Sequence, residues 1–171
     1  MIRFRMGDKE ADDPTKHYAS DIYRGHKADI FDGGHRVPYI ARWSGKVKAG
    51  SVCSDPVCLI DLFATCADVV GKKVPETAAE DSFSILSSLL DKADQPPREA
   101  VVHHSINGSF AIRQGKWKLY RFYEKFNVVE AYKEELYDLE SDPGEANDLS
   151  QQYPERVKKL NSRLNALERW K

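Results

Sequence analysis

The sequence has few cysteines, and their spacing excludes two common ways of stabilising a small protein. Its 171 residues include three cysteines, an odd and small number for a framework of disulfide bonds. Four residues separate Cys53 from Cys58 and seven separate Cys58 from Cys66, so no CxxC pair is present for a zinc site. All three lie in or beside one apolar stretch, and we expect them to be small buried side chains.

Long apolar runs and an excess of positive charge are also lacking. No run approaches the ~18 consecutive apolar residues of a membrane-spanning helix, so we expect no association with a membrane. The formal net charge is −1, and no basic cluster matches the face that a nucleic-acid-binding protein presents to phosphates. The polar residues 1–10 hold no apolar signal region, so a secretory signal of an exported protein is expected upstream. The lack of a basic cluster makes nucleic acid an unexpected partner. Hydrophobic residues make up 41% of the chain, which favours a packed core.

The first half of the chain predicts one strand and two helices. Residues 1–19 have little periodicity and predict a loop or a disordered end. The apolar run Val37–Trp43 predicts a buried strand. Asp55–Val70 predicts a largely buried helix with Asp55 as its N-cap, because apolar residues recur there every three or four positions. Ser84–Leu90 predicts a short second helix.

The period changes after Gln95–Arg98, a segment typical of a linker. Alternating apolar residues predict four short strands, at 100–104, 110–113, 117–122 and 136–139. Gln114-Gly115 predicts a hairpin between the second and third of these strands. Pro154 begins a final helix that carries one apolar stripe, made of Val157, Leu160, Leu164 and Leu167.

The tripeptide Asp142-Pro143-Gly144 predicts a turn after the last strand. Proline sets φ at the second position of such a turn, and we expect Gly144 to take a positive φ at the third.

Four motifs follow one another along residues 20–171. The first is Gly25-His26-Lys27 with Asp32-Gly33-Gly34-His35-Arg36-Val37-Pro38, and the second lies within Ile60–Gly71. The third is Trp117-Lys118-Leu119, and the fourth is Glu135–Leu139 with Asp142-Pro143, Glu145 and Asn147-Asp148-Leu149. In this order they resemble the C-terminal part of the sulfatase family, in particular the arylsulfatases. These are sulfuric ester hydrolases of the alkaline-phosphatase-like superfamily.

The resemblance implies an α/β fold class, here an α+β fragment. We expect the C-terminal part of an alkaline-phosphatase-like α/β sheet domain, followed by a small antiparallel sheet packed with a C-terminal helix. The expected division is an N-terminal loop over 1–19, the end of the catalytic domain over 20–97, and the sheet-and-helix subdomain over 98–171.

The resemblance also implies roles for one lysine and three histidines. Sulfatases place a lysine at the position of Lys27 to hold the sulfate, a task that suits a compact ammonium with three donors. His26 and His35 flank that position, and either is compatible with substrate contact or with an ordinary turn. His103 and His104 are adjacent on a strand and must point to opposite faces, and we take His104 as the substrate-facing one. Gly33 and Gly34 are expected to be architectural.

Other family features are missing from this sequence. The family's nucleophile is a formylglycine made from the first residue of a Cys-x-Pro-x-Arg or Ser-x-Pro-x-Arg motif, and no cysteine here has that context. The calcium ligands of a complete family member, an early Asp pair and a Ser-Asp-Asn-Gly run, are missing as well. Asp32 stands where the family usually has Glu. We therefore expect this chain to be inactive alone and to pack against a missing N-terminal part of a sulfatase.

The implied substrate is a sulfated small molecule, such as an aryl sulfate, or a sulfated glycan, and the family suggests a periplasmic or extracellular location. Two alternatives stay open. The chain is then either a non-catalytic remnant that binds sulfated glycans, or part of a related phosphodiesterase or phosphonate hydrolase.

Overall fold

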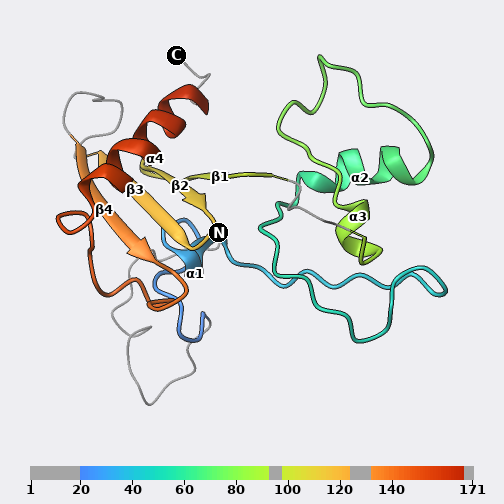
Figure 1. The fold of residues 1–171 in the computed structure, drawn as a ribbon, viewed down its shortest axis with the longest axis horizontal. Helices are drawn as coiled ribbons and strands as arrows, with labels where there is room; N and C mark the ends of the chain where they lie inside the picture. The colour runs from blue at the N-terminus through green and yellow to red at the C-terminus, as the bar shows by residue number, and fades with distance from the viewer. Residues whose placement is uncertain (1–19, 93–97, 124–131, 168–171) are drawn as a thin grey trace, which may run out of the picture. The chain divides into compact units, whose positions relative to one another are not determined.

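The computed structural model describes residues 20–92, 98–123 and 132–167 (Figure 1). The predicted loop over 1–19 and most of the predicted linker lie outside these residues. The described chain forms two compact units. We call residues 20–36, 103–111 and 116–167 the sheet unit, and residues 37–102 and 112–115 the helical unit, apart from the gaps.

A four-stranded antiparallel sheet has the order β1-β2-β3-β4. Its strands are β1 (Val101–His104), β2 (Phe110–Gln114), β3 (Trp117–Tyr123) and β4 (Tyr132–Asp138). β3 pairs with β4 from Trp117 opposite Asp138 to Tyr123 opposite Tyr132. The predicted hairpin is confirmed, since Gly115 has a φ of +58° between β2 and β3. All four predicted strands are present, and β4 begins four residues earlier than its apolar pattern indicated.

The predicted final helix is confirmed as α4 (Pro154–Leu167). In Figure 1 it lies across the sheet, and it contacts β3. Leu160 and Leu164 are fully buried. Polar contacts add to this packing, because Arg121 Nη2 on β3 donates to Asn161 Oδ1 at 2.8 Å and to Asn165 Oδ1 at 2.9 Å.

A second small core packs the short helix α1 (Asp32–His35) and the residues before it onto the sheet. Ile30 is buried with Tyr120 and Tyr137 in one cluster. The ring of Phe31 lies 5.2 Å from that of Tyr120. Segment 20–36 is thereby part of the sheet unit, although residues 37–100 separate it from the first strand.

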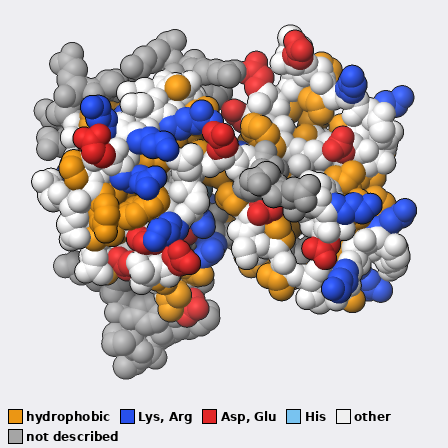
Figure 2. Space-filling view, viewed as in Figure 1, with side chains coloured by type: hydrophobic (Ala, Val, Ile, Leu, Met, Phe, Trp, Pro, Cys, Tyr) orange, Lys and Arg blue, Asp and Glu red, His pale blue; other side chains and the backbone are white. Residues whose placement is uncertain are grey.

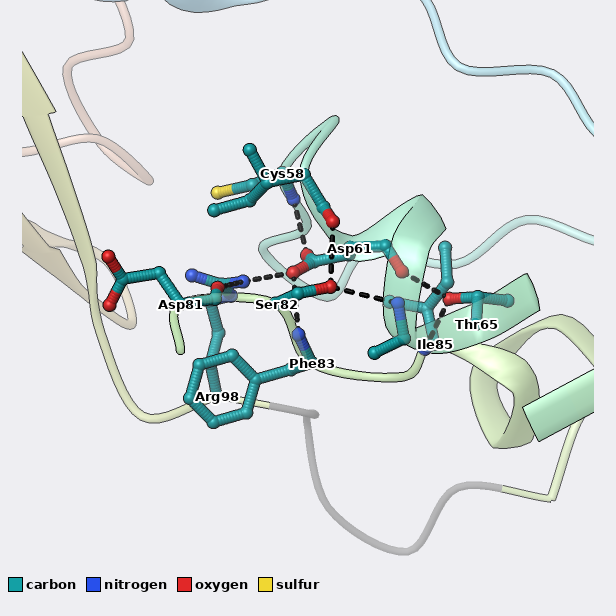
Figure 3. A network of polar contacts seen from close by, with 10 residues as sticks. Cys58, Asp61, Thr65, Asp81, Ser82, Phe83, Ile85 and Arg98 are labelled. Carbon is teal, nitrogen blue, oxygen red and sulfur yellow. Dashed lines mark hydrogen bonds and ion pairs between the residues drawn. The ribbon is translucent and has the colours of Figure 1, made fainter. Parts of the chain in front are cut away.

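The helical unit is organised around a buried carboxylate (Figure 3). It contains α2 (Asp61–Val69) and α3 (Leu86–Leu89). Asp61 is fully buried and its carboxylate accepts hydrogen bonds from the backbone N–H groups of Cys58, at 2.7 Å, and Phe83, at 3.0 Å. Arg98, which the sequence pattern assigned to a linker, forms an ion pair with Asp61.

The prediction of a largely buried helix over Asp55–Val70 is wrong in two respects. The helix begins only at Asp61, whose carboxylate holds the N–H of Cys58, while Asp55 accepts a hydrogen bond from Ser88. Its buried residues are Asp61, Ala64 and Thr65. The apolar side chains that predicted burial are exposed instead: Leu59, Ile60, Leu62, Phe63, Val69 and Val70. Among the described residues these side chains have no neighbour able to cover them.

Two further expectations for the helical unit are wrong. Val37–Trp43 is not a strand but an exposed extended segment, and Ile40 is 92% exposed. A strand requires a partner to accept its backbone hydrogen bonds, and no described segment pairs with it. Cys53 and Cys66 are exposed and only Cys58 is partly buried.

The turn after β4 differs from its prediction at one residue. The positive φ falls on Glu145, at 53°, and not on Gly144. This conformation is unfavourable for a residue with a side chain. Contacts of the Glu145 carboxylate, described below, explain why this conformation is retained.

None of the helices in the described segments has the length and the apolar composition of a transmembrane helix.

Truncation of a buried apolar side chain is expected to cost far more stability than truncation of an exposed one. Leu160→Ala is expected to lower the free energy of unfolding by about 2–5 kcal/mol, because Leu160 is fully buried. Phe63→Ala is expected to change it by less than about 0.5 kcal/mol, because Phe63 is 56% exposed. Urea unfolding of both variants measures the difference, and equal losses would contradict the burial of Leu160 and the exposure of Phe63.

Candidate functional site

A tight bend formed by residues 24–29 carries Lys27. The N–H of Gly33 donates to the carbonyl of Arg24 at 2.8 Å. A Cβ on Gly33 would lie 2.3 Å from the carbonyl oxygen of Gly25, and one on Gly34 would lie 2.4 Å from that of Asp29. Neither position has room for a side chain. The architectural interpretation of the two glycines is thus correct, since they let α1 lie directly against the bend.

Lys27 and His26 both lie on the exposed side of this bend. His26 is held by Asp29, because Asp29 Oδ2 accepts from the His26 backbone N–H at 3.0 Å and lies 3.1 Å from His26 Nδ1. The bend is also tied to the sheet, where the N–H of Ile106 donates to the carbonyl of Ala28 at 3.2 Å. Lys27 is therefore presented by a backbone that is fixed on both sides.

The structure brings His35 next to His103 rather than His104. The rings of His35 and His103 lie 4.6 Å apart. His104 points the other way, as the alternation of a strand requires. It is exposed, and its ring lies 4.7 Å from that of Phe110.

A buried charge cluster lies directly behind the bend. Lys118 on β3 is fully buried, and its Nζ is 2.5 Å from Asp32 Oδ1 and 3.4 Å from Glu145 Oε1. Glu145 is also fully buried; its Oε2 accepts from the backbone N–H of Asp32 at 2.9 Å, and its Oε1 accepts from the Tyr120 hydroxyl. Arg24 Nη1 donates to the Glu145 carbonyl at 3.0 Å. We call Asp32, Lys118 and Glu145 the buried triad.

This environment changes the titration of two groups. Burial raises the pKa of Glu145, and the nearby Lys118 opposes this effect. Burial lowers the pKa of His35, and Lys118 lowers it further. Nε2 of His35 is buried without a hydrogen-bond partner in the described structure. The neutral imidazole is therefore favoured beside the bend.

Lys118 and Glu145 belong to the motifs found in the sequence, but the contact between them was not predicted. One signal was available. Lys118 alternates with Tyr120 and Phe122 along β3, so its side chain points to the same face as two apolar rings. A lysine in such a row must find a carboxylate, because an unpaired buried charge is very costly.

The part of the chain that forms the bend and the buried triad matches the model of a known protein family. A family model described as N-sulphoglucosamine sulphohydrolase, C-terminal, matches residues 26–170. The chain belongs to the sulfatase family. The resemblance that its motifs predicted is confirmed.

Similar sulfatases are much longer than this chain. N-acetylgalactosamine-6-O-sulfatase of Bacteroides thetaiotaomicron is 35% identical over 159 residues, which cover 88% of this chain and 31% of that protein. A solved structure concerning the metabolism of multiple glycosaminoglycans by Bacteroides thetaiotaomicron aligns with a TM-score of 0.73 and 35% identity, over 85% of this chain and 32% of the other. Another, in complex with its substrate D-glucosamine-2-N,6-O-disulfate, aligns with a TM-score of 0.61 and 26% identity, over 74% and 27%.

These alignments confirm the predicted fold class, the C-terminal part of an alkaline-phosphatase-like sulfatase. The chain spans about a third of the length of the relatives it matches. No three His, Cys, Asp or Glu side chains of the described residues converge as ligands for the calcium that the family implies.

Removing the cation of the buried triad is expected to destabilise the sheet unit strongly. Lys118→Met leaves two carboxylates buried without a counter-charge, and we expect a loss of about 3–5 kcal/mol in the free energy of unfolding at pH 7. The loss should shrink as the pH is lowered from 7, because burial raises the pKa of Glu145 and favours its neutral form. Lys133→Met removes an exposed lysine that also pairs with a glutamate. This control is expected to leave the urea midpoint nearly unchanged, and similar losses in the two variants would contradict the role of burial.

His35 is expected to make stability depend on pH. Its pKa in the folded chain lies below the ordinary 6.5, so as the pH falls toward and below 6.5 the unfolded chain takes up a proton before the folded one does. The free energy of unfolding should therefore decrease from pH 7.5 to pH 5.5. His35→Gln should show a smaller decrease in urea unfolding over the same range. Identical slopes would show that His35 titrates normally.

Proposed function

We propose that the chain is the C-terminal part of an enzyme that hydrolyses sulfate esters, and that it contributes Lys27 as the sulfate-binding cation. The proposal is carried by one observation. In a member of the sulfatase family, the Gly-x-Lys bend is fixed by a glycine contact and backed by a buried triad, while its lysine stays exposed. Such a preorganised cation can stabilise charge on a sulfate oxygen or on the leaving oxygen.

The histidines near the bend then have different tasks. His26 is oriented by Asp29 and sits next to Lys27 in the chain, which suits a hydrogen-bond donor to the substrate. His35 is held neutral by burial and by Lys118, so it can accept or pass on a proton near neutral pH. His104 is exposed at the end of β1 and is proposed to contact the part of the substrate beyond the sulfate.

The nucleophile is proposed to come from a segment outside this sequence. None of the three cysteines lies in a Cys-x-Pro-x-Arg context. In a complete sulfatase the formylglycine would supply a hydrated aldehyde that attacks sulfur. The residues of this chain bind and orient the sulfate ester.

The remaining part of the sulfatase is proposed to cover the exposed apolar face of the helical unit. Leu62, Phe63 and Val70 in and beside α2 are 43%, 56% and 67% exposed, and Ile40 in the extended segment is 92% exposed. So many exposed large apolar side chains in one small unit are typical of a protein that normally packs against another segment or partner. The chain also spans only about a third of its relatives.

Sulfated glycans are the proposed substrates. One relative is named as an N-acetylgalactosamine-6-O-sulfatase and one aligned structure holds a sulfated glucosamine. We also propose a periplasmic or extracellular location, where such polymers are encountered.

A chimeric sulfatase tests the role of Lys27. Residues 20–171 replace the matching C-terminal part of the 35% identical N-acetylgalactosamine-6-O-sulfatase, and turnover of a 6-O-sulfated sugar is measured. Lys27→Ala is expected to lower turnover by on the order of 10²-fold or more, because one preorganised donor to the sulfate is lost.

Lys48→Ala, which removes another exposed lysine, serves as the control and should have little effect. Equal activity of the Lys27→Ala and Lys48→Ala chimeras would refute the assignment. The isolated chain should not hydrolyse 4-nitrophenyl sulfate, and clear metal-dependent turnover would refute the external nucleophile. Binding of sulfated sugars without any chimera activity would instead support a non-catalytic binding module.

A further inference from the structure

A cluster of aromatic rings and cations lies on the face of the sheet opposite the bend. Lys118 points from β3 toward Asp32, so its neighbour Trp117 points to the other face, the face that Arg121 shares with α4. There the ring of Trp117 lies 5.1 Å from that of Tyr153, which directly precedes α4. Tyr153 is 46% exposed, so part of its side chain is accessible to a ligand.

Two cations beside these rings have no acidic partner. The guanidinium carbon of Arg156 lies 5.5 Å from the centre of the Trp117 ring, and Lys159 follows one helical turn later. Neither forms an ion pair with a carboxylate in the part of the chain that the structure describes. Lys116 differs, because its Nζ is 2.6 Å from Asp138 Oδ2 and is already neutralised. Arg156 and Lys159 are thus available to an anion.

The surface is slightly hollowed where these residues meet. A shallow groove is lined by Gln152–Arg156 and Lys159. Glu155 belongs to the same lining, and in Figure 2 hydrophobic side chains on the sheet unit lie among basic and acidic ones. A surface that places aromatic rings beside cations is suited to a ligand that is itself part apolar and part anionic.

We propose that Trp117, Tyr153, Arg156 and Lys159 form a second binding surface for a sulfated glycan chain. The apolar face of a sugar ring would pack on Tyr153, and the planar fork of Arg156 would bind a sulfate group with two hydrogen bonds. This inference rests on the proposed function, since it assumes a glycan substrate. It assigns to the opposite face of the sheet a site that holds the polymer while Lys27 engages one sulfate.

A sulfated glycan suits the surface better than two other anionic ligands. A polyphosphate offers charge but no apolar face for Tyr153. An acidic peptide carries single carboxylates on flexible side chains and lacks the rigid rings that match a flat aromatic surface. Both are included in the test.

Calorimetric titration of the whole 171-residue chain with chondroitin 6-sulfate tests the inference. Binding is expected to weaken as NaCl is added, because the attraction is between exposed charges. Tyr153→Ala and Arg156→Gln should each weaken binding about tenfold. Lys159→Gln should weaken it less, and Glu155→Gln should strengthen it by removing the acid that lines the same groove.

Matched variants separate binding from folding. Tyr153→Phe keeps the ring and should bind as the wild type does, and Lys72→Gln removes an exposed lysine of the helical unit without effect. Unsulfated chondroitin and polyphosphate should each bind about tenfold more weakly than the sulfated polymer.

Three outcomes overturn the inference. They are a wild-type chain that does not bind the sulfated polymer, unchanged binding in Tyr153→Ala and Arg156→Gln, and polyphosphate binding as tight as that of the glycan. Binding lost in Lys27→Ala but kept in the other two variants would overturn it while supporting the role proposed for the bend. Binding lost only in Tyr153→Ala and Arg156→Gln supports the second surface and leaves the chimera test to decide on Lys27.

Discussion

The ion pairs that Lys118 makes with Asp32 and Glu145 join three segments that are far apart in the sequence. Asp32 begins α1, Lys118 lies in β3, and Glu145 belongs to the turn after β4. Burying three charges is expensive, and such clusters often add little to net stability. They nevertheless constrain the positions of these three segments closely, because each buried charge must lie within reach of its partner. The bend that carries Lys27 is therefore positioned by the interior of the sheet unit rather than by its own short loop.

The positive φ of Glu145 illustrates how strong that constraint is. Glycine would adopt this backbone conformation more easily, and Gly144 stands one residue earlier. Yet only a carboxylate at position 145 accepts from the Asp32 backbone and from the Tyr120 hydroxyl at once. The local backbone is left in an unfavourable state so that the buried charges are satisfied. The turn chemistry that predicted positive φ at Gly144 considered local preferences alone and missed this constraint.

Much of the sheet unit could be predicted from the sequence. The four strands, the hairpin at Gly115 and the helix from Pro154 follow from local patterns, and their burial is completed by neighbours within the same chain. The helical unit was predicted poorly because an apolar pattern predicts burial, and the apolar side chains of α2 are exposed in the described residues. Leu62 and Phe63 were expected to be buried, but they are 43% and 56% exposed and no described segment covers them. The role of Arg98 was missed because an ion pair between distant residues leaves no periodic signal. The alternation along β3 indicates the face to which Lys118 points, but it does not identify the carboxylates that Lys118 meets.

The contact between His35 and His103 has a consequence for how the chain is laid out. The rings of these residues lie 4.6 Å apart, so the polypeptide leaves the sheet unit just after Arg36 and re-enters it beside the point of departure. Residues 37–102 thus begin and end at neighbouring positions of the sheet unit. Insertions and deletions are well tolerated in a segment connected in this way. This segment can therefore change in length or in surface without moving the bend that carries Lys27.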